Sequence, residues 1–261
     1  MSTVLAVVNQ KGGVGKTTTT VSLGAALALR GQSVLIIDAD PQANATTALG
    51  VRQGEGGGLY ESMVDERPLD ATVVATAVPG LSLVPTTPHL AGAEVELVSI
   101  MAREFRMKRI LDPLRDRFGV ILIDCPPSLG LLTVNALAAA DEVIIPVQCE
   151  YLALEGLGHL AQTIRLVQAN LNPRLRIRGI VLTMFDSRTN LARQVEEEVR
   201  QHFANTFRAV IPRSVRLSEA PSHGAPIQLY DPQSTGAQAY DQLADELLAQ
   251  LQPAGGAIAH G

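Results

Sequence analysis

The chain has 261 residues and a net charge of −5, and its composition is 46% hydrophobic but only 3% aromatic. That length permits one sizeable core, near the upper end of roughly 250–300 residues for a single domain, and the charge excludes a protein that is basic all over. No apolar run approaches the ~18 residues of a membrane span, and no basic leader precedes the first one, so we expect a cytoplasmic protein. Two cysteines, Cys125 and Cys149, are too few for a disulfide framework or a metal-ligand cluster, and we expect both to be buried.

Along the chain, apolar runs rich in β-branched residues alternate with stretches of helical character. The runs are continuous rather than alternating in polarity, which is typical of parallel strands covered on both faces. The alternation predicts an α/β fold with a doubly wound, mostly parallel sheet flanked by helices on both faces, and ligands at the carboxyl ends of the strands. The predicted strands are 3–8, 33–38, 81–86, 119–127, 142–148 and 178–185, and the predicted helices are 17–30, 151–171, 190–203 and 234–251.

We expect residues 1–251 to form a single domain, because no repeat or change of composition divides them. Residues 52–58, RQGEGGG, predict a flexible surface loop. Residues 252–261 are too small and polar to pack, and they predict a disordered tail.

The stretch NQKGGVGKTTTT, residues 9–20, follows the first predicted strand and points to a phosphate-binding loop. The common P-loop pattern is G-x-x-x-x-G-K-[ST], and because Gln10 stands at its first glycine the match is partial. Gly12, Gly13 and Gly15 still let backbone N–H groups converge on phosphate oxygens. The helix that follows adds its positive end.

Lys16 would give this loop a point charge for the outer phosphates, and the Thr17 hydroxyl would be a ligand for Mg²⁺. The alternative is a glycine-rich turn without a ligand. Composition weighs against it, because the chain has three lysines against eighteen arginines, and two of the three, Lys11 and Lys16, lie in this loop. Where arginine supplies ordinary surface charge, a retained lysine indicates a need for a compact ammonium. We therefore predict a site for ATP and Mg²⁺.

Such a site needs a carboxylate at the end of another strand to organise Mg²⁺ and water. Asp124, at the end of VILID, fits this role directly or through a bound water, and the second predicted strand offers Asp38 and Asp40. We predict that Thr17, Asp38 and Asp124 serve the metal and that Asp40 orients the attacking water. No Gln or Arg obviously completes this arrangement, so we expect slow ATP hydrolysis that a partner stimulates.

These motifs resemble the ParA/MinD group of ATPases. KGGVGKTT, with its extra lysine, is similar to the deviant Walker A motif of that group. DADPQAN with the later ALG is similar to its second motif, and ILIDCPPSLGLLTVNAL is similar to its Walker B segment. LTMFDSRTNL and VIPRSVRLSEAPSHGAPI resemble the chromosome-partition members, the ParA proteins also called Soj. The resemblance covers residues 2–250.

The resemblance implies that Lys11 crosses a dimer interface and touches the phosphates of the partner's ATP, so that ATP would control homodimerisation. Lys11 would then be catalytic together with Lys16 and Asp40. The resemblance also places the purine near IPRS, which without it reads as the end of a strand with an exposed arginine. The implied nucleotide-binding residues are Lys11, Gly12, Gly13, Val14, Gly15, Lys16, Thr17, Thr18, Pro212, Arg213 and Ser214.

A partition function is the further implication of the resemblance. The ATP dimer would bind DNA without sequence preference, associate with the nucleoid, and hydrolyse ATP when a ParB-type centromere-binding protein stimulates it. Residues 174–216 hold nine arginines against four acids, a local charge of +5, and Arg188 and Arg216 lie in the family's motifs. A solvated helical face is the alternative for such a charge run, and it suits three of these arginines better: Arg193, Arg200 and Arg208.

Three relatives of other function remain as alternatives. MinD-like proteins bind membranes through a basic amphipathic C-terminal helix, whereas this sequence has no Lys or Arg after Arg216. A reductase like nitrogenase iron protein needs two exposed interfacial cysteines, for which Cys125 and Cys149 are poorly placed. A metabolic amidotransferase or synthetase needs a further substrate site, which we do not find in the sequence.

Overall fold

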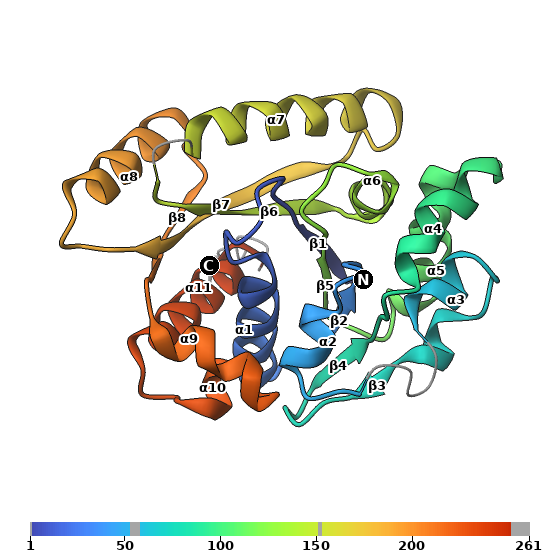
Figure 1. Ribbon diagram of the computed structural model, residues 1–261, viewed down its shortest axis with the longest axis horizontal. Helices are drawn as coiled ribbons and strands as arrows, with labels where there is room; N and C mark the ends of the chain where they lie inside the picture. The colour runs from blue at the N-terminus through green and yellow to red at the C-terminus, as the bar shows by residue number, and fades with distance from the viewer. Residues whose placement is uncertain (1, 53–57, 151–152, 252–261) are drawn as a thin grey trace, which may run out of the picture.

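The computed structural model describes residues 2–52, 58–150 and 153–251, and the strands of these residues form one sheet (Figure 1). The strand order is β3-β4-β2-β5-β1-β6-β7-β8. All neighbouring strands are parallel except β3 and β4, which are antiparallel. The strands are β1 (Thr3–Val7), β2 (Val34–Asp38), β3 (Val74–Ala75), β4 (Leu81–Val84), β5 (Val120–Asp124), β6 (Glu142–Gln148), β7 (Arg176–Phe185) and β8 (Thr206–Pro212).

Helices cover both faces of the sheet (Figure 1). One layer contains α1 (Lys16–Leu29), α2 (Asn44–Ala48), α9 (Val215–Glu219), α10 (Ile227–Tyr230) and α11 (Thr235–Leu251). The other contains α3 (Leu59–Met63), α4 (Leu90–Glu96), α5 (Arg106–Leu111), α6 (Leu131–Ala139), α7 (Ala153–Asn170) and α8 (Asn190–His202). Short 3₁₀ turns span Leu69–Thr72, Leu97–Ser99, Arg103–Phe105, Asp112–Leu114 and Ala220–His223.

Strand β1 shows how the sequence builds these two layers. Val4 and Ala6 pack into the core on the α6 side, Leu5 and Val7 pack into the core on the α1 side, and all four are fully buried. Burial of each Leu or Val side chain favours the folded state by roughly 1.5–3 kcal/mol. A strand covered on both faces has no solvated side, so its sequence is a continuous apolar run.

The predicted doubly wound α/β fold is confirmed, and each predicted strand and helix overlaps an observed one. Strand β3 was missed, and of β8 only its end at IPR was anticipated. In β8 buried and more exposed residues alternate, because the strand lies at the edge of the sheet, and β3 has only two residues. Of the predicted helix 151–171, residues 151–152 lie outside the described residues, as do 53–57 of the predicted loop and the predicted tail 252–261.

The strand order brings the predicted site residues to one edge of the sheet. β5 lies between β1 and β2, and in the registers of these pairs Asp124 is the partner of both Val7 and Asp38. The loop that follows β1 therefore begins beside two carboxylates at the carboxyl ends of neighbouring strands. None of the helices in the described parts of the chain has the length and apolarity needed to cross a bilayer.

Candidate active site

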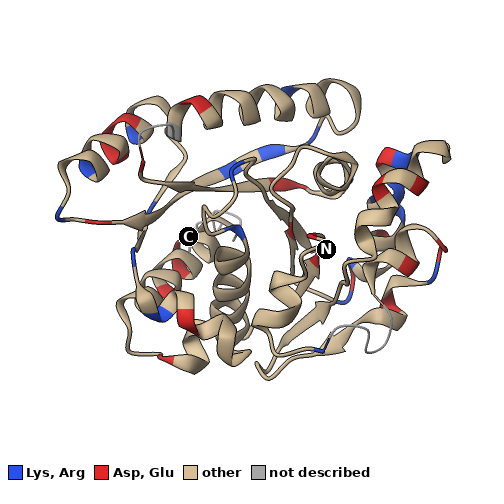
Figure 2. Ribbon diagram, viewed as in Figure 1, with Lys and Arg blue, Asp and Glu red and all other residues tan. Residues whose placement is uncertain are grey.

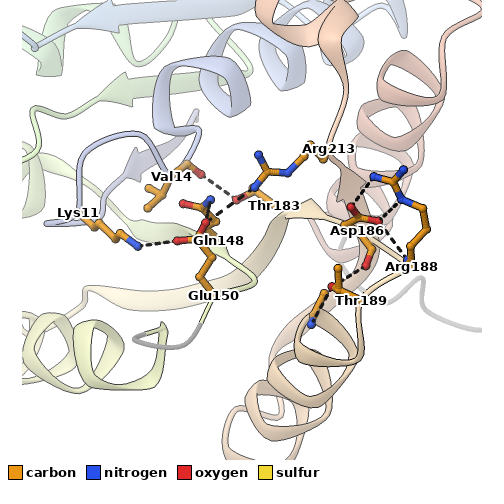
Figure 3. Close-up of polar contacts among 10 residues, drawn as sticks. Lys11, Val14, Gln148, Glu150, Thr183, Asp186, Arg188, Thr189 and Arg213 are labelled. Carbon is orange, nitrogen blue, oxygen red and sulfur yellow. Dashed lines mark hydrogen bonds and ion pairs between the residues drawn. The ribbon is translucent and has the colours of Figure 1, made fainter.

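The loop between β1 and α1 has the backbone that its glycines predict. Gly13 and Gly15 have φ values of 73° and 87°, in the left-handed region where residues with a Cβ are strained. Gly15 is also the N-cap of α1, so the helix starts directly from the loop. The Thr183 hydroxyl at the end of β7 donates to the Val14 carbonyl at 2.8 Å and holds the loop against the sheet (Figure 3).

Lys16 lies inside this loop with only 7% of its surface exposed. Its Nζ donates to the Lys11 carbonyl at 3.0 Å. Burial lowers the pKa of the Lys16 ammonium, and the nearby charges of Asp124 and Asp40 oppose that shift. Lys16 and Asp40 line one pocket of about 330 Å³ together with Gly12, Gly13, Gly15, Thr17, Thr18, Gln42, Asn44, Pro127 and Met184. The pocket therefore presents an ammonium and the first turn of α1 to a ligand, which suits a phosphate.

Asp124 lies at the base of this region and is fully buried. The Thr17 hydroxyl donates to its Oδ2 at 2.7 Å, and the Thr20 hydroxyl lies 3.1 Å from its Oδ1. Burial first, and then the charge of Asp38, raise the pKa of Asp124 to about 8. A hydroxyl beside a crowded carboxylate is a set of hard oxygen donors, and a divalent cation held there would relieve the repulsion. The residues present thus fit Mg²⁺.

Asp38 is equally buried, and its oxygens are engaged within the chain. Oδ2 accepts hydrogen bonds from the backbone N–H of Thr46 at 2.8 Å and from its hydroxyl at 2.7 Å, while Oδ1 accepts the Asp40 N–H at 3.3 Å. Burial raises the pKa of Asp38 to about 6. The geometry makes Asp38 a support for the loop between β2 and α2, and a role at the metal stays a prediction.

Asp40 lies beside the predicted phosphate loop. It is 5% exposed, lines the pocket with Lys16, and accepts the Gln42 N–H through Oδ1 at 3.0 Å. Its role in orienting an attacking water stays a prediction. The sequence offered no obvious glutamine for that role, yet Gln42 also lines this pocket.

A second pocket, of about 310 Å³, adjoins the loop on the β8 side. Pro212, Arg213 and Ser214 line it beside Gly15 and Thr18, together with Thr183, Met184, Ile211, Leu217, Ser218, Pro221 and Tyr240. The predicted base-contacting residues are thus next to the predicted phosphate loop. As the strand-end reading of IPR predicts, β8 ends at Pro212 and the Arg213 side chain is 59% exposed.

The second lysine of the loop has a different environment from the first. The Lys11 side chain is 50% exposed, and its Nζ donates to Glu150 Oε2 at 3.1 Å (Figure 3). It therefore lies at the rim of the site, while Lys16 lies within it. Lys11 does not line the pocket that contains Lys16 or the adjoining pocket on the β8 side.

The two arginines predicted to bind DNA already have acidic partners. Arg188, whose side chain is 85% exposed, donates to Asp186 through Nε at 2.9 Å and through Nη2 at 2.7 Å, and these bonds lower the pKa of Asp186 to about 2 (Figure 3). Arg216 pairs with Glu219 at 3.1 Å and Asp231 at 3.4 Å. Figure 2 shows acids beside basic residues on α8 and α9. The +5 of residues 174–216 already counts Asp186, and Glu219 and Asp231, which lie beyond residue 216, compensate part of the remainder.

Both cysteines are buried, as predicted. Burial raises the pKa of the Cys125 thiol well above its usual value and that of Cys149 to about 12. Neither thiol is disposed to become an exposed thiolate, which an interfacial iron–sulfur cluster requires.

Several residues of the site were missed from the sequence. Thr20 contacts Asp124, Thr46 holds Asp38, and Thr183 holds Val14. Tyr240 lines the second pocket, and its hydroxyl lies 3.1 Å from that of buried Thr19. The run of four threonines after Lys16 was a local signal for Thr20; the other contacts join distant parts of the chain.

The sequence comparisons agree with one another. Residues 2–177 match the AAA domain family. The sporulation initiation inhibitor protein Soj of Bacillus subtilis (strain 168) is 55% identical over 251 residues, which cover 95% of this chain and 99% of that protein. The chromosome partitioning protein ParA of Myxococcus xanthus (strain DK1622) is 52% identical, with 96% of this chain and 89% of the relative covered.

Solved structures share the fold over nearly the whole chain. Cobyrinic acid a,c-diamide synthase from Mycobacterium smegmatis with bound ADP and magnesium has a TM-score of 0.82 at 41% identity, with 96% of this chain and 95% of that chain covered. The cell division ATPase MinD of Pyrococcus furiosus has a TM-score of 0.81 at 27% identity, with 96% of this chain and 100% of that chain covered.

Proposed function

Because the chain belongs to the Soj/ParA family of chromosome-partitioning ATPases, we propose that it is the nucleotide-controlled switch of a bacterial partition system. ATP closes two copies into a sandwich dimer, the dimer binds DNA without sequence preference, and hydrolysis stimulated by a ParB-type protein releases it. The observation that carries this proposal is the different exposure of the two loop lysines. Lys16 lies inside the pocket and is 7% exposed, whereas the Lys11 side chain lies at the rim and is 50% exposed.

ATP and Mg²⁺ are the proposed ligands. A relative 41% identical to this chain binds ADP and magnesium. Here the backbone of residues 12–18 would hold the phosphates, Thr17 and Asp124 would hold Mg²⁺, and Pro212, Arg213 and Ser214 would contact base or ribose. When bound, Mg²⁺ would neutralise negative charge that develops on the phosphate oxygens.

Hydrolysis depends on two residues of the chain in this proposal. Lys16 leaves the Lys11 carbonyl and donates to the outer phosphate oxygens, where its point charge stabilises the transferring group. Asp40 accepts a hydrogen bond from the attacking water and orients it. Since Asp40 is the one residue proposed to orient this water, hydrolysis would be slow until a partner contributes a cation.

Lys11 is the proposed link between nucleotide and dimer. Two loops that each carry a triphosphate repel one another unless cations are supplied across the interface. An exposed ammonium at the rim can supply this charge to the partner's nucleotide. Loss of the γ-phosphate would remove the contact and loosen the dimer.

DNA binding completes the proposed cycle. Arg188 and Arg216 exchange their carboxylate partners for DNA phosphates, and the dimer presents both arginines twice. We place the protein in the cytoplasm, associated with the nucleoid, and residues 1–251 act as one domain.

The synthase activity of the Mycobacterium smegmatis relative is a weaker candidate. A third pocket, of about 280 Å³, adjoins Thr17 and Thr18 between α1, α2 and α10, but its lining includes no Lys or Arg to hold an acid substrate. Glutamine-dependent amide synthesis also needs a reactive nucleophile, and both cysteines are buried. The membrane alternative likewise lacks support, because α11 (Thr235–Leu251) carries acids and no Lys or Arg.

The proposed function is tested by sedimentation of the Asp40→Ala variant with ATP, with ADP and without nucleotide, each with and without duplex DNA of random sequence. We expect a dimer only with ATP and co-sedimentation with DNA only for the dimer. Lys16→Ala should stay monomeric in all conditions. A hydrolysis-blocked protein that stays monomeric in saturating magnesium ATP would refute the proposal.

A further inference from the structure

Glu150, two residues after the end of β6, contacts three side chains from different parts of the site (Figure 3). Its Oε2 accepts the hydrogen bond from Lys11 Nζ at 3.1 Å. Its Oε1 accepts a hydrogen bond from Gln148 Nε2 and lies 3.8 Å from Arg213 Nη2. One carboxylate thus holds a cation from the phosphate loop and another from the second pocket.

Both cations have other tasks in the proposed cycle. Lys11 would reach the partner's phosphates, and Arg213 lines the pocket for the base or ribose. While Glu150 holds them, Lys11 lies against its own chain. Glu150 is therefore the anion that Lys11 and Arg213 both contact within one chain.

A second contact holds the same loop residue through its backbone. Lys16 Nζ donates to the Lys11 carbonyl at 3.0 Å. A phosphate that attracts the Lys16 ammonium would remove this bond, since an ionised acceptor forms a stronger hydrogen bond than a carbonyl. Residue 11 would then keep the Glu150 ion pair of its side chain and the hydrogen bond from its N–H to Asn9 Oδ1 at 3.0 Å.

The ion pair between Lys11 and Glu150 is of the exposed type that contributes little free energy. The side chains of Lys11 and Glu150 are 50% and 45% exposed, and Arg213 is 59% exposed. Water and salt screen such pairs, so a multiply charged phosphate can displace the carboxylate. The pair is strong enough to bias the position of Lys11 and weak enough to be exchanged.

We propose that Glu150 is a positioning residue that holds Lys11 on its own chain until ATP binds, and that it thereby raises the ATP concentration needed for dimerisation. The role in dimerisation rests on the proposed function. The pairing of Lys11 with Glu150 within one chain does not, and it can be measured on the monomer.

The first experiment measures that pairing by lysine acetylation of the nucleotide-free monomer. The sequence has only three lysines, so peptide mass spectrometry can follow each, with exposed Lys108 on α5 as the internal reference. Glu150→Gln should raise the labelling rate of Lys11 relative to Lys108. The matched control is Glu219→Gln, which breaks an ion pair with Arg216 elsewhere and should leave Lys11 unchanged. An unchanged Lys11 rate in Glu150→Gln would overturn the proposal, whatever the protein's function.

The second experiment titrates ATP against dimer formation in the Asp40→Ala background, by sedimentation. Glu150→Gln should lower the half-maximal ATP concentration, roughly twofold to fivefold for each pair released, the range that exposed ion pairs contribute. A higher half-maximal ATP concentration would show that Glu150 acts across the dimer interface. An unchanged concentration would show that Glu150 does not hold Lys11 back. Either result overturns the proposal. If neither protein dimerises, the proposed function fails and the control of dimerisation with it, while the labelling result still decides the pairing.

Discussion

Asp186 restrains Arg188, and its removal should strengthen DNA binding. The Asp186 carboxylate accepts three hydrogen bonds from Arg188, from the backbone N–H at 3.1 Å, from Nε at 2.9 Å and from Nη2 at 2.7 Å. A DNA phosphate would have to replace the two side-chain bonds. Asp186→Asn removes the charge while its amide oxygen can still accept the backbone N–H, so the turn before α8 should persist.

The size of the effect follows from the ion pair that each chain breaks when it binds DNA. In the proposed cycle the parent dimer already uses both copies of Arg188, so Asp186→Asn adds no phosphate contact and should leave the slope of log affinity against log salt unchanged. An exposed ion pair contributes about 0.2–1 kcal/mol, and the dimer has two of them, so the variant should bind DNA roughly 2-fold to 30-fold more tightly.

Fluorescence anisotropy with a labelled random duplex, at four or more salt concentrations and with ATP in the Asp40→Ala background, measures the affinities and the slopes of variant and parent. Asp245→Asn is the matched control, because it removes the same negative charge and also breaks an Asp–Arg pair, with Arg30 directly after α1. Equal gains from both variants would mean that net charge alone matters. If Asp186→Asn binds DNA no better than the parent, Arg188 is not a phosphate contact.

Two further predictions concern stability without nucleotide. Asp124 holds a proton in the folded chain up to a pKa of about 8 but only to about 4 when unfolded, so stability falls as pH rises between these values. The melting temperature of Asp124→Asn should therefore rise relative to that of the parent from pH 5 to pH 8. A difference that stays constant over this range would contradict the buried-carboxyl account. Tyr240→Phe leaves the buried Thr19 hydroxyl without its partner, which should lower the free energy of unfolding by about 1–3 kcal/mol. The double variant with Thr19→Val should recover part of that loss. Strictly additive losses in thermal unfolding would show that the two hydroxyls do not interact.

The sequence predicted those parts of the site that depend on local pattern. The glycines and lysines of residues 9–20 specify the loop by themselves, and buried parallel strands are recognisable as continuous apolar runs. Asp38 and Asp124 follow two such runs, so their position at the same edge could be expected from the fold class alone. Edge strand β8 could not be recognised in this way, because its exposed side interrupts the run.

The unpredicted contacts depend on the strand order. Glu150 lies 139 residues from Lys11, and Thr183 lies 169 residues from Val14. They meet because β6 lies next to β1 in the sheet and β7 lies next to β6. No local sequence pattern specifies this strand order. Counting charges within a window of sequence was misleading for a related reason: Glu219 and Asp231, the acids that face Arg216, lie outside the window.

In the proposed function, the acid partners of the cations would explain how a chain of net charge −5 binds a polyanion under nucleotide control. Lys11, Arg188 and Arg216 each face a carboxylate of their own chain, so each phosphate contact would be an exchange of anions with a small net gain. Contacts of small gain become effective only in number, and a dimer would present twice as many of them to one DNA molecule. Strong, unpaired cations would instead let the monomer bind DNA and would disconnect DNA binding from ATP. We therefore expect the compensated charge to keep the single chain off DNA until it dimerises.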